Sequence, residues 1–385
     1  MSGCMLVSMR QRGGCCPGNR KRPSSGWSAW PSNRGVLDEH AGSFRRRAEA
    51  EGVCFGMRRK EAQHACMLVG LAEEVERVPG ACAILRKVGR MRLWPFAHSA
   101  MQAATGAEQR RFEEARRMHY EAGLTKSAEV GRPFLLRPWR VKGGVVLVHG
   151  YMAAPLEVRA LGEYLRRHGY AVYGVRLEGH GTAPGDLAAT PWERWCASIQ
   201  RGLAIVSMLS EHVFVGGFSM GAGLALLEAG RNRERVRGVF AISAPLYLRS
   251  SMVRLVPSVV RVNSLLKRIH WDRTEWEYVR NDPENPHINY TRNPLSGVEQ
   301  LSYAMQAMCD ALPHISAPTL IIQGSEDPVV APSSGPAIFS RVGTKHKQLL
   351  VFERQNHGIV NGSGSEDVFD AVCRFLPWAH ARSGG

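Results

Sequence analysis

One serine in the 385-residue chain stands in a pattern that could make it a nucleophile. Ser219 is the centre of Gly217–Gly221, a Gly-x-Ser-x-Gly segment that follows an apolar run at 213–215 and precedes the small-residue run 222–228. Small residues on both sides allow a sharp turn from a strand into a helix, which holds a serine hydroxyl exposed in a strained backbone. The five-residue motif alone is weak evidence, but here a strand-like run precedes it and a helix-like run follows it. We therefore predict that Ser219 is a nucleophile that attacks a substrate.

A serine hydroxyl is a poor nucleophile until a base removes its proton, and the base needs a carboxylate to orient it. In the fold that uses this turn, the acid and the base follow the serine in that order, each on a loop after a strand. Asp327 and His357 stand at these two places in the sequence. We assign Asp327 as the acid and His357 as the base, with Glu326 as the competing acid and Asp310 as a more distant one.

The oxyanion that forms on an attacked carbonyl needs a pair of backbone N–H donors. One is expected from Met220, directly after the nucleophile, and the other from Tyr151, in a loop after the apolar run 145–148. His149 in that loop is interpreted as a structural hydrogen-bonding residue. The Gly-His-Gly segment 179–181 is interpreted as a tight turn, since it lacks both the GxGxxG pattern and the lysine of a phosphate loop.

The elements that must position these residues alternate from about residue 132 onward. Short, nearly continuous apolar runs are typical of strands buried on both faces of a parallel sheet. The predicted strands are 145–148, 171–175, 213–215, 236–242, 319–322 and 349–352, and the predicted helices are 155–168, 191–209, 221–231 and 366–376. This alternation predicts an open, mostly parallel α/β sheet flanked by helices, with its active groups at the carboxyl ends of the strands.

One connection in this domain of residues 131–385 is too long for an ordinary crossover. Between Ile242 and Thr319 lie 76 residues, where about a dozen or two suffice. We therefore predict a helical cap inserted between the strands, at about 246–314. Its apolar residues recur at spacings near three and four, a pattern that a helix packed on the core would share. They are Leu255, Val256, Val259, Val260, Leu265, Leu266 and Ile269.

Residues 1–130 differ in character, and we expect an N-terminal extension of unknown function that is largely disordered or weakly helical. Gly, Pro, Ser, Arg and Trp are mixed in its first part with little periodicity. Two segments, 61–78 and 107–122, are predicted helices. A further hypothesis is that translation begins at a later methionine, Met91 or Met101.

The net charge of +16 by itself favours nucleic acid or an anionic membrane surface as a partner. Residues 1–130 carry 22 Lys and Arg against 13 Asp and Glu, so the excess is concentrated in the first third of the chain. No aromatic residues are interleaved with the basic ones, as they are in single-strand binding grooves. We attribute the charge to coding bias and expect no nucleic-acid partner. The alternative of another class is a basic nucleic-acid-binding protein with a non-catalytic version of this fold.

The cysteine pattern indicates the redox state of the thiols and whether a zinc site is expected, and the hydropathy indicates whether a membrane segment is expected. The nine Cys are odd in number and form no CxxC pair, so we expect reduced thiols and no zinc site. Nothing at the N-terminus has the pattern of a signal peptide, and no run of about 18 apolar residues exists. We therefore expect a cytoplasmic protein without a transmembrane segment.

Five separate segments, in order and sensibly spaced, resemble the bacterial carboxylesterase and monoacylglycerol lipase-like branch of the α/β-hydrolases. They are Leu147–Tyr151, Val175–Pro184, Gly217–Gly221, Ala317–Val330 and Asn356–Gly358, within roughly 132–380. The resemblance implies a capped α/β-hydrolase whose catalytic triad is Ser219, Asp327 and His357. It places oxyanion amides at Tyr151 and Met220, and it implies no metal and no organic cofactor.

The sequence thus predicts a serine carboxylic ester hydrolase that works through an acyl-enzyme on a small-molecule ester. The resemblance implies esters with short or medium acyl chains, monoglycerides among them, as substrates. Relatives often carry Phe where Tyr151 stands, a departure that touches the acyl pocket. They also often carry Ser-Gly where this chain has Gln355-Asn356. The same triad would serve a lactonase, a thioesterase, an amidase or an acyltransferase, because these reactions differ mainly in the leaving group and in what deacylates the enzyme.

Overall fold

A computed structural model of the chain describes residues 94–249 and 277–383. The predicted helix at 61–78 and the apolar residues between 255 and 269 lie outside the described residues. No helix within the described ranges is both long enough and apolar enough to cross a membrane.

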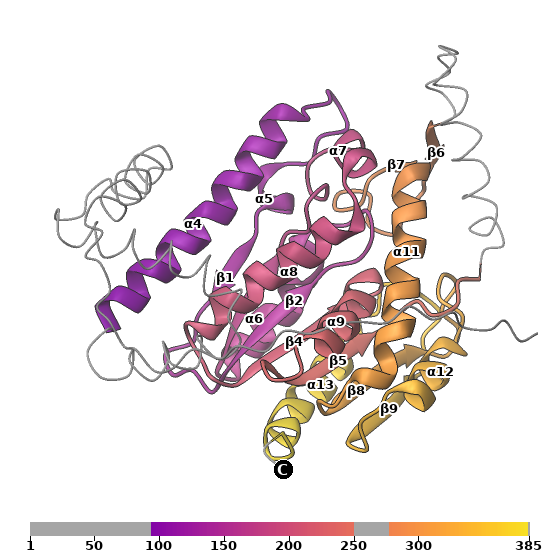
Figure 1. Cartoon of the computed structure of the whole chain (residues 1–385). Helices are drawn as coiled ribbons and strands as arrows, with labels where there is room; N and C mark the ends of the chain where they lie inside the picture. The colour runs from indigo at the N-terminus through magenta and orange to yellow at the C-terminus, as the bar shows by residue number, and fades with distance from the viewer. Residues whose placement is uncertain (1–93, 250–276, 384–385) are drawn as a thin grey trace, which may run out of the picture.

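A seven-stranded sheet forms the centre of the described structure (Figure 1). Its strands are β1 (Phe134–Leu136), β2 (Gly143–Val148), β3 (Tyr170–Val175), β4 (Val213–Phe218), β5 (Val236–Ile242), β8 (Thr319–Gly324) and β9 (Lys347–Phe352). They lie in the order β1-β3-β2-β4-β5-β8-β9. Strand β1 pairs antiparallel with β3, and the other five pairings are parallel. The predicted fold class, a mostly parallel α/β sheet flanked by helices, is confirmed.

The strands are apolar on both faces because helices cover both faces, as in other parallel sheets. Val145 and Leu147 of β2 belong to one hydrophobic cluster, while Val146 and Val148 belong to the other. All four side chains are fully buried. Successive side chains of a strand point to opposite faces of the sheet, so β2 contributes to the hydrophobic core on each face.

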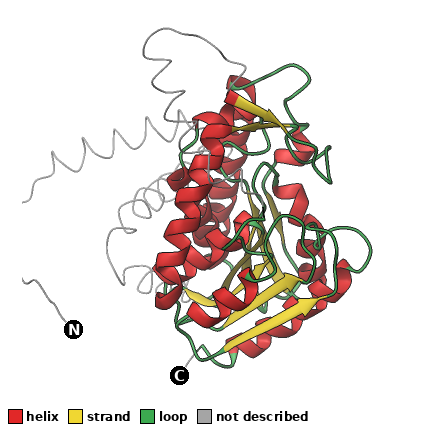
Figure 2. Cartoon of the chain, turned by 90° about the vertical axis from the view of Figure 1, so that its right-hand side faces the viewer, coloured by secondary structure: helices red, strands yellow, loops and turns green. Residues whose placement is uncertain are grey.

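Helices lie on both sides of the sheet (Figure 2). They are α4 (Trp94–Met118), α5 (Ala128–Gly131), η1 (Pro155–Val158), α6 (Arg159–Arg167), α7 (Pro184–Ala189), α8 (Trp192–Ser207), α9 (Met220–Arg231), α11 (Leu295–Ala311), η4 (Leu312–His314), α12 (Ser334–Arg341) and α13 (Ser365–His380). Buried residues of α8, α9, α11 and α12 join the cluster on one face. Those of α6 and α13 join the cluster on the other face.

Helix α4 falls within the predicted N-terminal extension, yet it packs on α8. Phe112 is fully buried, and the guanidinium of Arg176 lies 5.6 Å from the centre of its ring. Glu108 is buried as well, and its carboxylate binds Arg201 of α8 at 2.8 Å. The helix begins at Trp94, earlier than the predicted start at 107.

The described part of the long connection contains a two-stranded antiparallel sheet and a helix. Strands β6 (Tyr278–Arg280) and β7 (Arg292–Pro294) pair with each other, and α11 follows β7 directly. Helix α11 packs against α9, which follows the predicted nucleophile (Figure 1). This part of the predicted cap therefore also covers the core beside the site.

Candidate active site

Ser219 lies in the turn between β4 and α9, with φ 53° and ψ −124°. This conformation is rare for residues other than glycine, so the surroundings must hold it. The backbone N–H of Ser219 donates to the carbonyl of Ile242 at 2.8 Å. A Cβ on Gly217 or Gly221 would collide with the backbone carbonyl of Val148 on the neighbouring strand. Both glycines of the motif are therefore required for the turn to pack against β2.

His357 lies between the other two predicted catalytic side chains. Its Nδ1 is 2.7 Å from Asp327 Oδ2, and its Nε2 is 2.9 Å from Ser219 Oγ. With the carboxylate ionised, Nδ1–H donates to Asp327 and Nε2 accepts the hydrogen of the serine hydroxyl. The structure thus brings the three residues together, with His357 after β9 and Asp327 after β8.

Asp327 is fully buried in its loop. Its Oδ1 accepts hydrogen bonds from the backbone N–H groups of Val329 and Val330, at 2.8 and 2.9 Å. Burial favours the neutral carboxyl, but the hydrogen bond and charge of His357, together with the two amides, outweigh it and lower the pKa of Asp327. The carboxylate is therefore ionised at neutral pH and can orient the imidazole.

The two alternative acids lie elsewhere. Glu326 is exposed beside Asp327. Asp310 is on α11, where its Oδ1 accepts a hydrogen bond from Gln306 at 3.0 Å. Within the described residues, neither carboxylate contacts His357.

The loop after β2 brings the backbone of Gly150, the residue before Tyr151, close to the nucleophile. A Cβ on Gly150 would lie 3.4 Å from the Cβ of Ser219. Met152 follows with φ 58°, a second left-handed residue that is not glycine. In the described part of the chain, the N–H groups of Tyr151 and Met220 donate to no other protein group. Within the described residues, no protein acceptor thus competes for either predicted oxyanion donor.

His149 is fully buried, and both ring nitrogens have partners. Its Nδ1–H donates to the carbonyl of Gly150 at 2.9 Å, and its Nε2 accepts the N–H of Leu177 at 3.3 Å. Burial lowers the pKa of His149 to about 4, so the ring is neutral at pH 7. Gly179 and Gly181 both have positive φ, as a tight turn requires.

Two carboxylates near the histidine were not found by sequence reasoning. Exposed Glu284 accepts the backbone N–H groups of His357 at 3.1 Å and Gly358 at 3.0 Å. Glu157 is buried on η1 and accepts the N–H of Gly150 at 2.6 Å. Neither lies in a local motif, since Glu284 reaches the site from the long insertion. Only the contact of each carboxylate with a distant loop identifies it, and a single sequence does not show such contacts.

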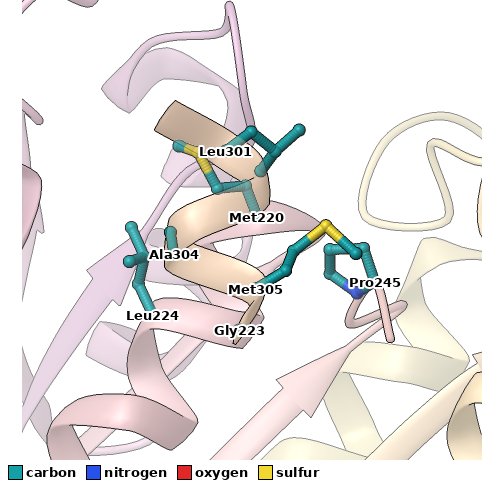
Figure 3. Close-up of a pocket in the computed structure, with 7 residues that line it drawn as sticks. All are labelled: Met220, Gly223, Leu224, Pro245, Leu301, Ala304 and Met305. Carbon is teal, nitrogen blue, oxygen red and sulfur yellow. The ribbon is translucent and has the colours of Figure 1, made fainter. Parts of the chain in front are cut away.

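An apolar pocket opens between α9 and α11, next to Met220 (Figure 3). Its lining residues are Met220, Gly223, Leu224, Pro245, Leu301, Ala304 and Met305. Such a pocket suits a hydrocarbon group better than a charged one. In residues 94–249 and 277–383, no group of three or more His, Cys, Asp or Glu is arranged to hold a metal ion.

The fold and the strand-turn-helix serine together define an α/β-hydrolase. A family model described as Serine aminopeptidase, S33 matches residues 140–363, more than half of the chain, and the chain belongs to this family.

Two curated relatives are similar over most of their own length. A thermostable monoacylglycerol lipase of Bacillus sp. (strain H-257) is 28% identical over 217 residues, which cover 56% of this chain and 82% of the relative. A carboxylesterase of Bacillus subtilis (strain 168) is 26% identical over 244 residues, covering 62% of this chain and 96% of the relative.

Solved structures agree on the fold. One, from work on the metagenome-derived lipolytic enzymes LipS and LipT, has a TM-score of 0.56 and 26% identity, covering 64% of this chain and 97% of the other. The monoacylglycerol lipase of Paleococcus ferrophilus has a TM-score of 0.52 at 24% identity, covering 64% and 98%. The second likeness bears on the fold alone.

Proposed function

We propose that this chain is a serine carboxylic ester hydrolase that forms an acyl-enzyme on Ser219. The observation that carries the proposal is the continuous path from Asp327 Oδ2 through His357 to Ser219 Oγ, at 2.7 and 2.9 Å. The general class, a carboxylic ester hydrolase, is also the class named for the curated monoacylglycerol lipase and carboxylesterase relatives.

In the acylation step, Ser219 Oγ attacks the ester carbonyl while His357 Nε2 takes the hydroxyl proton. The N–H groups of Tyr151 and Met220 donate to the oxyanion, where charge develops. When the tetrahedral intermediate collapses, the C–O bond to the alcohol breaks and His357 returns its proton to the leaving oxygen. Asp327 keeps Nδ1 protonated and stabilises the imidazolium throughout.

Deacylation repeats these steps with water as the nucleophile. His357 removes a proton from a water molecule that attacks the acyl carbonyl, and the same two amides hold the second oxyanion. The products are a carboxylic acid and free Ser219. No step calls for a metal or an organic cofactor.

We expect esters with short or medium acyl chains, monoglycerides among them. Support comes from the apolar lining of the pocket beside Met220, which offers a hydrocarbon group apolar contacts next to the nucleophile. The hydroxyl of Tyr151 donates to Asn293 Oδ1 at 3.0 Å, so the long connection holds this side chain in place. Two curated relatives are named monoacylglycerol lipases.

A lactonase, a thioesterase, an amidase or an acyltransferase would use the same triad. The family's description names an aminopeptidase, so amide substrates belong in any test. The cytoplasmic location, the absence of a nucleic-acid partner and the division at residue 130 stay predictions from the sequence.

The deciding experiment is hydrolysis of p-nitrophenyl esters of increasing chain length, with the matching anilides, by the wild type and by Ser219→Ala. We expect ester cleavage by the wild type, with an optimum at short or medium chains, and none by the variant. Ser340→Ala is the matched control, since Ser340 is exposed on α12. Faster cleavage of anilides than of esters would move the function to an amidase, and no cleavage at all would refute the proposal.

A further inference from the structure

A buried carboxyl group that the proposed mechanism does not use lies beside the nucleophile. Glu157, on η1, is only 5% exposed. Its Oε2 accepts the N–H of Gly150 at 2.6 Å, a short, charge-assisted distance. The backbone of Gly150 adjoins Ser219, because a Cβ on Gly150 would lie 3.1 Å from Glu157 Oε2 and 3.4 Å from Ser219 Cβ. The backbone of Gly150 thus lies between the carboxyl group of Glu157 and the turn that carries Ser219.

The loop that follows is held in a conformation it would not adopt alone. Met152 has φ 58°, which costs free energy for a residue with a Cβ and persists only when neighbours impose it. The carbonyl of Met152 accepts the N–H of Tyr290 at 3.0 Å. Gly150 is held by Glu157 and Met152 by Tyr290, with Tyr151 between them. The Tyr151 N–H lies in one peptide plane with the Gly150 carbonyl, which accepts from His149 Nδ1 at 2.9 Å and from the N–H of Ala153 at 3.3 Å. Its direction therefore depends on these contacts together with the anchors at Gly150 and Met152.

We infer that Glu157 is a positioning residue, which aims the Tyr151 amide at the oxyanion through its hydrogen bond to Gly150 and whose charge acts on His357. The inference rests on the proposed function, because it takes Tyr151 as an oxyanion donor. It adds a residue outside the triad and the oxyanion amides.

Burial raises the pKa of Glu157 to about 7. The hydrogen bond from Gly150 and the charge of His357 oppose this shift, and the charge of Glu284 adds to it. Both forms of the carboxyl group are therefore populated near neutral pH. The ionised form attracts the imidazolium of His357 and repels an oxyanion at the adjoining amide.

The elements packed against η1 bring few other charges to Glu157. Glu129 on α5 is exposed. Arg159 begins α6, and its guanidinium lies over the ring of Phe134, 5.0 Å from the centre. His149, on the loop after β2, is neutral because burial lowers its pKa to about 4. His357 and Glu284 are thus the charged groups that matter to Glu157.

Two substitutions separate the hydrogen bond from the charge. Glu157→Gln keeps an oxygen that can accept the N–H of Gly150 but has no charge. Glu157→Leu has a similar volume and removes both. Glu163→Gln is the matched control, because Glu163 lies on α6, partly exposed and paired with Arg166.

The readouts are kcat and KM on a p-nitrophenyl ester between pH 5 and 9. We expect Glu157→Leu to lower kcat about tenfold to a hundredfold with little change in KM, less than the loss of an oxyanion donor outright. Glu157→Gln should keep kcat within a few fold. Its profile of kcat/KM should have a simpler acid limb, because the variant lacks the carboxyl group that titrates at about 7 in the wild type. A Gln profile that superimposes on the wild type, or a Leu variant with wild-type kcat, would overturn the inference.

A second measurement needs no substrate and therefore separates this inference from the proposed function. A carboxyl group with a pKa near 4.5 in the unfolded chain and about 7 in the folded one stabilises the fold below pH 4.5, and this contribution is lost as the pH rises to 7. The Tm of Glu157→Gln should therefore rise relative to that of the wild type between pH 4.5 and 7. A constant difference would show that Glu157 does not titrate there and would refute the charge part, even in a chain that cleaves no ester.

Discussion

Glu284 holds the backbone of His357 with both of its carboxylate oxygens. Oε1 accepts the N–H of His357 at 3.1 Å, and Oε2 accepts the N–H of Gly358 at 3.0 Å. Glu284 comes from the connection between β5 and β8, so a segment inserted into the sheet topology fixes the loop that carries the proposed base.

Removing this anchor should reduce turnover more than binding. We expect Glu284→Ala to lower kcat about tenfold with KM nearly unchanged, since a misplaced base costs rate. Glu284→Gln, which keeps one accepting oxygen, should fall between this variant and the wild type. Asp282→Ala is the control, because Asp282 is exposed in the same segment. Steady-state kinetics on a p-nitrophenyl ester measures all three, and equal loss in the control would show a general effect on the segment.

The choice between neighbouring acids can be tested directly. Asp327→Asn should lower kcat about ten-thousandfold, because the amide cannot hold the imidazole in the productive tautomer. Glu326→Gln should remain active, because Glu326 is exposed and outside the hydrogen-bond path. Parallel kinetics, with Tm to verify folding, decides the matter. Inactive Glu326→Gln with active Asp327→Asn would reverse the assignment.

The free energy of unfolding should fall on mild acidification, because His149 is buried in its neutral form. Its pKa is about 6.5 when exposed and about 4 in the fold, so the unfolded chain takes up the proton first as the pH falls. This contribution is complete above pH 6.5 and is lost by pH 4, a change of about 3 kcal/mol in the free energy of unfolding. Glu157 acts in the opposite direction over pH 4.5 to 7. Urea unfolding at several pH values should therefore show a flatter acid slope for His149→Gln than for the wild type.

Two glycine substitutions should have opposite signs. Gly221→Ala should destabilise the fold by about 3 kcal/mol or more, because its Cβ would meet backbone of β2. Gly106→Ala, in the middle of α4, should stabilise it by about 1 kcal/mol. There the Cβ would meet only the end of the Arg110 side chain, at 3.3 Å. Thermal unfolding tests both, and a stable, active Gly221→Ala would contradict the close packing of the turn.

The strands and the three proposed catalytic residues could be predicted from the sequence, because short local patterns mark them. Apolar runs gave all six predicted strands, because strands buried on both faces need little beyond hydrophobicity. The Gly-x-Ser-x-Gly turn located Ser219, and chain order after later strands pointed to Asp327 and His357. The structure places these three side chains in hydrogen-bond contact.

The rest depends on contacts between distant segments. Strand β1 has only three residues and exists because it pairs with β3. The predicted helix at 155–168 begins as a 3-10 turn, η1, where the chain bends to bring Glu157 to Gly150. Glu284 lies 73 positions before the residue it supports. No periodicity marks such partners.

Helix α4 also sets where this protein can be shortened. A chain that begins at residue 131 would uncover the face of α8 on which Phe112 rests and leave Arg201 without Glu108. Beginning at Met101 would remove the first seven residues of a 25-residue helix. A start ahead of Trp94 retains the whole helix, so recombinant work on the hydrolase domain should place its boundary there and treat α4 as part of the folded unit.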